Sequence, residues 1–131
     1  MPKVFTSDKQ KIGEEGENVA CNYLVKEGFI ITERNYTKKW GEIDVIGKKD
    51  DKLYFFEVKS TSVTHVTNLD DYRPEDNMHP WKIKRLSRTI QTYLLERDVS
   101  ENMDWQFDVL VVFLNLEKRT GKVRRIENVI L

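Results

Sequence analysis

The sequence predicts an α/β protein in which helices cover a β-sheet. Two segments carry apolar residues at helical spacing, one at 9–27 and one at about 80–97. Between them, three consecutive segments are rich in β-forming residues, at 29–36, 42–46 and 53–59. A strongly apolar segment, 107–114, follows the second helix. The expected order is therefore αβββαβ, with 122–130 as a candidate for a last edge strand.

Each predicted helix has one apolar face. In the first, the small and apolar residues on one side are Ile12, Gly16, Val19, Ala20, Tyr23 and Leu24. Gly28 is placed to end this helix, because glycine adopts the left-handed conformation that closes many helices. In the second, the apolar stripe consists of Ile83, Leu86, Ile90 and Leu94. Segment 107–114 is apolar on both faces, which is typical of a central strand covered by helices.

Length and composition limit the organisation of the chain. With 131 residues, of which 39% are hydrophobic, it has material for one core. We expect residues 1–8 to form a mobile tail and residues 9–131 to form a single domain. The 22 basic and 22 acidic residues cancel, so no overall field attracts a polyanion. Any contact with nucleic acid must therefore be local.

Other sequence features favour a cytoplasmic protein that does not bind a membrane. The chain has no long apolar run, and its start has no apolar signal segment. The single cysteine, Cys21, cannot form an internal disulfide. With only His65 and His79 as companions, it does not make a zinc site either.

Three charged residues interrupt the apolar hairpin that the second and third strands form. If Lys49 to Lys52 is a four-residue loop, the register places Asp44 opposite Glu57. Strand alternation then groups two sets of side chains on one face, namely Glu42, Asp44 and Ile46 with Phe55, Glu57 and Lys59. Two carboxylates and an ammonium converge in this arrangement. Like charges at this separation repel each other unless a cation lies between them.

A divalent cation removes that repulsion. Carboxylates, main-chain carbonyls and water are ligands of hard ions such as Mg²⁺ or Mn²⁺. The pattern thus predicts metal-assisted phosphodiester hydrolysis, in which Asp44 and Glu57 hold the ion. Lys59 would orient a water molecule or stabilise developing negative charge. The simpler alternative is a solvated sheet face on which Lys59 neutralises Glu57 or Glu42.

The motif GEIDVI at 41–46, followed by FFEVKS at 55–60, resembles the PD-(D/E)xK nuclease superfamily. It resembles more closely the small bacterial YraN family, which is similar to archaeal Holliday-junction resolvases. The further matching motifs are GEEGENVACNYLVKEGF at 13–29, ERN at 33–35, KIKRL at 82–86 and FDV at 107–109. The resemblance implies a restriction-endonuclease-like αβββαβ core with a mixed central β-sheet flanked by helices.

The resemblance also implies residue roles. Asp44, Glu57 and Lys59 match the catalytic positions of the superfamily, and Glu17 matches a first-helix glutamate that helps to bind the metal. By helical spacing alone, Glu17 flanks the apolar face, where a solvated residue is the simpler interpretation. The sequence departs from the family at Ile43, where a proline usually precedes the aspartate.

A second departure is the loop from Thr64 to His79, which is longer and more acidic than the resemblance leads us to expect. A loop of this length is unusual inside a compact domain. The simpler interpretation is a disordered surface insertion. The functional interpretation is a lid or substrate-contacting segment beside the site.

The second helix supplies the basic surface that a nucleic-acid substrate needs. Its candidate phosphate-binding residues are Lys82, Lys84, Arg85 and Arg88. A second basic cluster consists of Lys118, Arg119, Lys122, Arg124 and Arg125. Either cluster can instead be a solvated face. The aromatic residues Tyr72, Trp81 and Trp105 are expected at core edges rather than in a base-stacking site.

These observations lead to a functional hypothesis with one main alternative. The hypothesis is an endonuclease that depends on Mg²⁺ or Mn²⁺ and acts on DNA, including branched or repair intermediates by analogy with resolvases. RNA is an open alternative substrate. Resolvase-like proteins are dimers because a junction offers two symmetric cleavage points, so a homodimer is one alternative for an oligomeric state that the sequence leaves open. The alternative is an inactive nuclease-fold module that binds nucleic acid or a protein partner.

Overall fold

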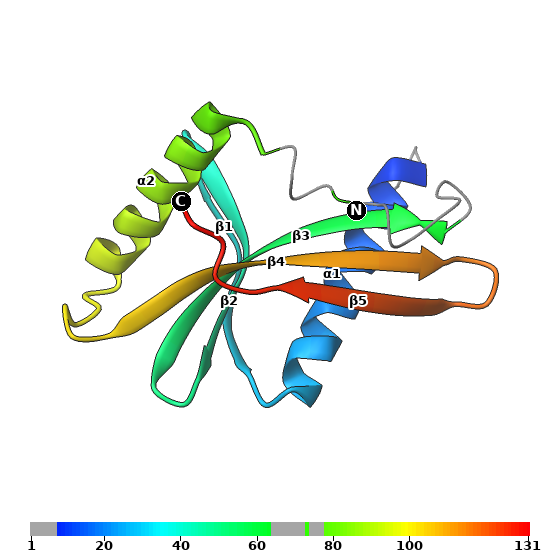
Figure 1. The fold of residues 1–131 in the computed structure, drawn as a ribbon, viewed down its shortest axis with the longest axis horizontal. Helices are drawn as coiled ribbons and strands as arrows, with labels where there is room; N and C mark the ends of the chain where they lie inside the picture. The colour runs from blue at the N-terminus through cyan, green and yellow to red at the C-terminus, as the bar shows by residue number, and fades with distance from the viewer. Residues whose placement is uncertain (1–7, 64–72, 74–77) are drawn as a thin grey trace, which may run out of the picture.

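The structure is a computed structural model that describes residues 8–63, 73 and 78–131. Its elements follow the expected order, with one further strand at the end (Figure 1). The elements are α1 (Asp8–Lys26), β1 (Ile30–Lys38), β2 (Gly41–Lys49), β3 (Lys52–Ser62), α2 (Pro80–Glu96), β4 (Asp104–Asn115) and β5 (Thr120–Ile126). Most of the expected tail at 1–8 lies outside the described residues, as does most of the loop from Thr64 to His79.

The five strands form one mixed sheet in the order β1-β2-β3-β4-β5. β3 and β4 are parallel, and every other neighbouring pair is antiparallel. A parallel pair needs a crossover connection, and α2 lies in this one. The prediction of a mixed sheet flanked by helices is confirmed. β5 is the expected edge strand, although it begins and ends earlier than 122–130.

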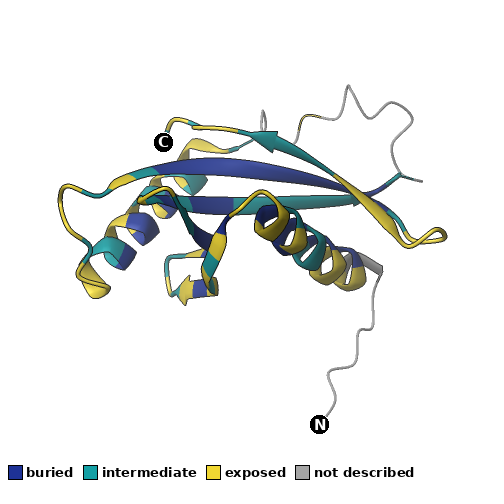
Figure 2. Ribbon diagram, turned by 90° about the horizontal axis from the view of Figure 1, so that it is seen from below, coloured by how far each residue is buried: buried dark blue, intermediate teal, exposed yellow. Residues whose placement is uncertain are grey.

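The two helices cover opposite faces of the sheet. On one side, Val109 and Val111 of β4 pack in a cluster with Ile90 of α2. On the other, Leu110 of β4 packs in a cluster with Leu24 of α1. Because successive strand residues point to opposite faces, β4 is buried on both sides, as its apolar sequence predicts. Figure 2 shows buried residues concentrated in the long central strands and exposed residues on the outer faces of the helices.

Both predicted turns are present, one with a different length. Gly28 follows the end of α1 with a φ of 93°, the left-handed conformation expected of it. In the β2–β3 hairpin, Lys49 pairs with Lys52, so the loop contains two residues and the prediction of a four-residue loop is wrong. Those two residues, Asp50 and Asp51, have φ angles of 51° and 61°, as a type I′ turn requires. Compared with the predicted loop, the shorter loop adds the residue pair Lys49 and Lys52 to the hairpin and leaves the predicted strand register unchanged.

Two glycines allow the helices to approach the strands that carry the candidate site. A Cβ on Gly16 of α1 would overlap the side chain of Ser60 on β3, one residue after Lys59. A Cβ on Gly41 of β2 would overlap the hydroxyl of Thr89 on α2. Glycine is therefore required at both positions for close packing. No helix in the described part of the chain is long and apolar enough to span a membrane.

Asp108 has a structural role in the sheet. Its side chain is 0% exposed, yet it accepts hydrogen bonds from Gln106 Nε2 at 2.7 Å, Arg125 Nε at 2.9 Å and the Asn128 backbone N–H at 2.8 Å. Arg125 also forms an ion pair with Glu127 at 3.1 Å. Arg125 of the C-terminal basic cluster is therefore paired with carboxylates of its own chain.

Candidate functional site

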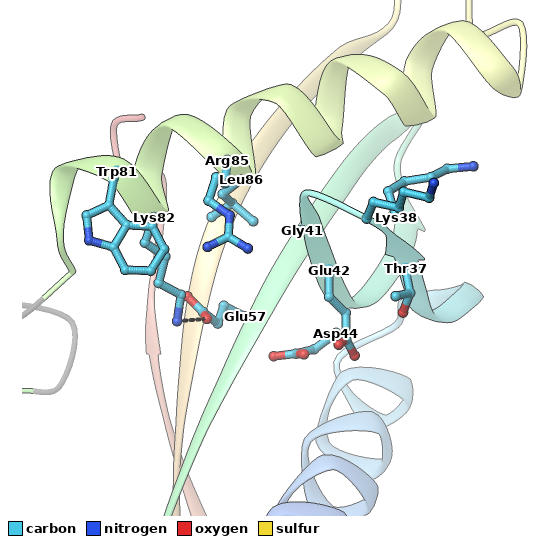
Figure 3. Close-up of a pocket in the computed structure, with 11 residues that line it drawn as sticks. Thr37, Lys38, Gly41, Glu42, Asp44, Glu57, Trp81, Lys82, Arg85 and Leu86 are labelled. Atoms are coloured by element: carbon cyan, nitrogen blue, oxygen red, sulfur yellow. Dashed lines mark ion pairs between the residues drawn. The ribbon is translucent and has the colours of Figure 1, made fainter.

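A pocket of about 490 Å³ opens between the start of α2 and the neighbouring parts of β1, β2 and β3 (Figure 3). Its walls combine carboxylates, cations and a tryptophan. The lining residues are Thr37, Lys38, Lys39, Gly41, Glu42, Asp44, Glu57, Trp81, Lys82, Arg85 and Leu86. The pocket thus contains the two carboxylates that the hairpin pattern brings together.

Asp44 lies where β2 and β3 separate. The ladder between these strands reaches the pair of Val45 and Phe56 and goes no further, although the register projects Asp44 opposite Glu57. Instead, Asp44 Oδ2 accepts a hydrogen bond from the backbone N–H of Val58 at 2.7 Å. The side chain takes the place of a backbone acceptor, which fixes the carboxylate at this point.

The surroundings of Asp44 disfavour its charged form. Burial raises the pKa of its carboxyl from 3.8 to about 7, against the lowering effect of the Val58 hydrogen bond. Repulsion by the carboxylates of Glu57, Glu42 and Glu17 adds to the rise. A cation bound nearby would stabilise the charged form of this carboxyl group.

The expected strand alternation does not hold throughout β2. Ile43 and Ile46 both pack in the cluster on the α2 side, whereas Val45 packs in the cluster on the α1 side. The face assigned to Glu42, Asp44 and Ile46 is therefore not continuous, and the prediction of strict alternation is wrong here. Glu42 nevertheless lines the pocket together with Asp44.

Glu57 uses its two carboxylate oxygens differently. Its Oε1 lies 2.7 Å from Lys82 Nζ and 3.5 Å from Lys59 Nζ. Its Oε2 is buried and has no hydrogen-bond partner among the residues that the structure describes. A buried, unpartnered carboxylate oxygen carries a desolvation cost of about 1–3 kcal/mol or more. This atom is thus suited to accept a bond from a ligand.

Lys59 is linked to the pocket through Glu57. It is not among the residues that line the pocket, and it meets Lys82 at the Glu57 carboxylate. Burial, and then the neighbouring Lys82, lower the pKa of the Lys59 ammonium, and the charge of Glu57 opposes this. Two lysines therefore compete for one carboxylate oxygen.

Glu17 lies in a different surface hollow. It forms an ion pair with Arg34 at 3.0 Å and accepts a hydrogen bond from Asn35 Nδ2 at 2.9 Å. With those two residues it lines a second pocket, of about 500 Å³, between α1 and β1. Its charge still influences Asp44, but its carboxylate is held by its own partners.

The four predicted phosphate-binding residues of α2 separate into two pairs. Lys82 and Arg85 line the pocket. Arg85 Nε donates to the Trp40 carbonyl at 2.8 Å. Lys84 is exposed outside the pocket, and the Arg88 guanidinium lies 4.1 Å from the centre of the Trp40 ring.

Sequence reasoning gave no site role to several residues of the pocket wall, and Glu42 and Trp81 are the two with the most chemistry to offer. Glu42 stands two positions before Asp44, so its charge in the GEIDVI motif was the available signal. Trp81 was expected at a core edge, but it is 52% exposed and lines the pocket. Trp105 does pack at the core, with its ring 5.6 Å from that of Phe55. Tyr72 lies outside the described residues.

The donor set of the pocket fits a hard divalent ion. Mg²⁺ characteristically uses one or two carboxylates and fills its other positions with water and phosphate oxygens. Asp44 and Glu57 supply two carboxylates, and the unpartnered Glu57 Oε2 is an available donor. Among residues with described side chains, no three His, Cys, Asp or Glu form a group that could hold a metal ion. The described residues of the pocket therefore suit an ion that takes two ligands from the protein, and they do not form a fully enclosed metal site.

The fold and the pocket define an α/β protein with a carboxylate–lysine site. Residues 16–112 match the model of the uncharacterised protein family UPF0102. A relative named UPF0102 protein from Campylobacter fetus subsp. fetus is 43% identical over 89% of this chain and 91% of that protein. A relative with the same family name from Campylobacter concisus is 40% identical over 76% of this chain and 81% of that protein. The relative from Campylobacter jejuni strain 81-176 is 38% identical over 74% of this chain and 79% of that protein. The chain belongs to the UPF0102 family, which confirms the YraN resemblance.

Proposed function

We propose that this protein is a metal-dependent endonuclease of the PD-(D/E)xK type, with a restriction-endonuclease-like core. Its substrate is nucleic acid, with DNA as the first candidate. One observation carries the proposal: the half-buried carboxylates of Asp44 and Glu57 line one pocket together with cationic side chains, and Glu57 Oε2 has no partner among the described residues. An unpartnered buried oxygen is uncommon in native proteins, and a bound ion is one of the explanations for it.

The cofactor in this proposal is Mg²⁺ or Mn²⁺. Asp44 and Glu57 would hold the ion, because their oxygens are hard donors and their mutual repulsion falls when a cation binds. Such an ion supplies a Lewis acid for a phosphoryl oxygen and lowers the pKa of water. Glu17 is held by Arg34 and Asn35, so in this proposal it acts on the site through its charge.

The other pocket residues bind and orient the substrate. Lys82 and Arg85 present positive charge at the pocket wall, where a phosphate group approaches the carboxylates. Lys59 lies beside Glu57 and can orient an attacking water or neutralise developing negative charge. The Val58 N–H keeps Asp44 in place during these steps. Lys82 and Arg85 act from the pocket wall, whereas Lys59 acts from beside Glu57.

The setting of the reaction is part of the same proposal. We place the protein in the cytoplasm, where it acts on branched or repair intermediates of DNA. A homodimer would present two pockets to a substrate with two symmetric cleavage points. Because the net formal charge of the chain is 0, substrate binding depends on the local charges of α2.

A cleavage panel tests the proposal. Purified protein with Mg²⁺ or Mn²⁺ is incubated with single-stranded, duplex and four-way-junction DNA. At least one substrate should be cut, and Asp44→Ala and Lys59→Ala should each abolish cutting without loss of fold. Matched controls are Asp104→Ala and Lys26→Ala, which change exposed residues of the same types. Cutting that persists in Asp44→Ala contradicts the mechanism.

One observation favours a second candidate, an inactive nuclease-fold module that binds nucleic acid or a protein. Lys59 and Lys82 both contact Glu57 Oε1, so ammonium groups already neutralise this carboxylate without a metal. Such a module would bind nucleic acid in a salt-dependent way and cut none of the three DNAs. Titration with Mg²⁺ or Mn²⁺ would then release no heat.

A further inference from the structure

Trp81 stands on the wall of the pocket, beside the Lys82–Glu57 pair (Figure 3). It is the second residue of α2 and is 52% exposed. Among the strongly exposed large apolar residues of the described chain it is the one aromatic, since the others are Val25, Ile30, Leu95, Leu116 and Ile130. A single exposed apolar residue is ordinary in itself, but this one is an aromatic ring that lines a pocket together with charged side chains.

The ring is held in position although it is not buried. The Arg85 guanidinium lies 4.9 Å from the ring centre, and the ring of His79 lies 5.5 Å away at an angle of 51°. Arg85 is itself fixed by its hydrogen bond to the Trp40 carbonyl at 2.8 Å. The β1–β2 turn and the start of α2 thus present a preoriented aromatic surface.

The cations beside this ring suit an anionic group. Lys82 and Arg85 stand on the same helix as Trp81 and line the same pocket, whereas the carboxylates of Glu42, Asp44 and Glu57 line its other walls. The first turn of α2 carries no acidic residue. A ligand that places an anionic group against Lys82 and Arg85 therefore meets attraction, and a flat apolar group attached to it can lie on Trp81. Nucleotides combine these two features in one repeating unit.

We propose that Trp81 stacks on an unpaired base next to the phosphate held in the pocket, so that the protein prefers substrates containing single-stranded nucleotides. In a continuous duplex both faces of a base are covered by its neighbours, so an external ring has no free face to contact. Single strands, gaps, flaps and branch points supply such a face. This inference rests on the proposed function, because it takes the ligand of the pocket to be nucleic acid.

The test is a binding experiment without metal. In EDTA, the full-length protein is titrated into a fluorescently labelled oligothymidylate and into an oligomer of equal length that has abasic sugars in place of the bases. The wild type should bind the base-bearing oligomer more tightly, by roughly 5- to 150-fold, the range for one stacked base. Trp81→Ala should remove this preference, and Trp81→Phe, which keeps a ring, should retain most of it.

The matched control is Leu95→Ala, which shortens an exposed apolar residue near the end of the same helix, 82% exposed. It should keep the preference of the wild type. Equal binding of the two oligomers by the wild type would overturn the inference, and so would a preference that survives in Trp81→Ala. Because no metal is present, the result is independent of cleavage. A base preference without any cutting refutes the nuclease alone, whereas cutting without base preference refutes only this inference.

Discussion

The carboxylate of Asp44 accepts a hydrogen bond from the backbone N–H of Val58, at 2.7 Å, at the point where β2 and β3 separate. This contact ties an acidic side chain to the strand that carries Glu57 and Lys59. It also explains how a half-buried carboxyl group with acidic neighbours keeps a defined position. The hydrogen bond that holds the Asp44 carboxylate therefore lies at the place where the pairing of β2 with β3 ends.

Replacing the Asp44 carboxyl should stabilise the metal-free protein at neutral and higher pH. Burial raises its pKa from 3.8 to about 7, so the folded protein holds this proton more tightly than the unfolded chain. The resulting stability is present below about pH 4 and is lost as the pH rises through about 7. Asp44→Asn keeps an acceptor for Val58 and removes the titration. In EDTA at pH 8 its free energy of unfolding should exceed that of the wild type by up to about 4 kcal/mol.

Denaturant unfolding at pH 4 and pH 8 measures this difference. The advantage of Asp44→Asn should nearly disappear at pH 4. Asp104→Asn, at an exposed position, should show no comparable change between the two pH values. An Asp44→Asn variant less stable than the wild type at pH 8 would contradict the electrostatic description of the site.

Enlarging Gly16 should destabilise the protein, because a Cβ there overlaps the Ser60 side chain and forces α1 away from β3. We expect Gly16→Ala to cost about 1–3 kcal/mol, as overpacking usually does. Gly13 lies on the same helix, and no neighbouring atom of the described chain comes within 4 Å of the place that a Cβ would take there. Gly13→Ala should therefore be neutral or stabilising by about 0.5–1 kcal/mol. Thermal unfolding of both variants compares the two positions directly, and equal effects would refute the close-packing explanation.

Removing the Asp108 carboxylate should be among the most damaging changes. Arg125 would lose its buried partner, and the Asn128 N–H and the Gln106 amide would lose their acceptor. Loss of one member of such a pair costs about 3–5 kcal/mol. Glu127→Ala removes the exposed partner of Arg125 and should cost under about 1 kcal/mol. Comparable unfolding midpoints for Asp108→Ala and Glu127→Ala would be inconsistent with this role.

Lys82 and Lys84 should differ in their effect on nucleic-acid binding. Lys82 lines the pocket, whereas Lys84 is exposed outside it. Lys82→Gln should lower affinity for oligonucleotides and reduce the slope of log affinity against log salt by about 0.7–0.9, the effect of one phosphate contact. Lys84→Gln should change that slope less. Identical salt slopes for both variants would show that the pocket wall does not bind phosphate.

The sequence predicts the order of elements because apolar periodicity distinguishes the helices from the strands. It also predicts the hairpin register, although with the wrong loop length, because a four-residue and a two-residue loop with the same centre give the same strand pairing. It does not predict the break in alternation near Asp44, because the break lies where the pairing of β2 with β3 ends and no local pattern marks that point. The sequence also does not predict that Glu17 lies outside the pocket, because this too depends on tertiary packing. Its partner Arg34 comes from another element, and only the packing of α1 on β1 brings them together.

The exposure of Trp81 likewise depends on tertiary structure. Its position after a helix-starting proline is compatible with a core edge, as sequence reasoning expected. In the structure the ring lines the pocket instead, beside the Arg85 guanidinium, which is bonded to the Trp40 carbonyl of another segment. Local patterns therefore identified the carboxylates and missed the aromatic surface beside them.

The central claim is that Asp44 and Glu57 share a divalent ion, and a crystal structure of the protein grown with Mn²⁺ tests it most directly. Anomalous scattering locates manganese independently of the protein atoms. We predict a manganese peak bonded to an Asp44 oxygen and to Glu57 Oε2, with Lys82 moved away or retained on Oε1. A well-ordered pocket with Lys82 on Glu57 and no manganese at saturating concentration would contradict the claim.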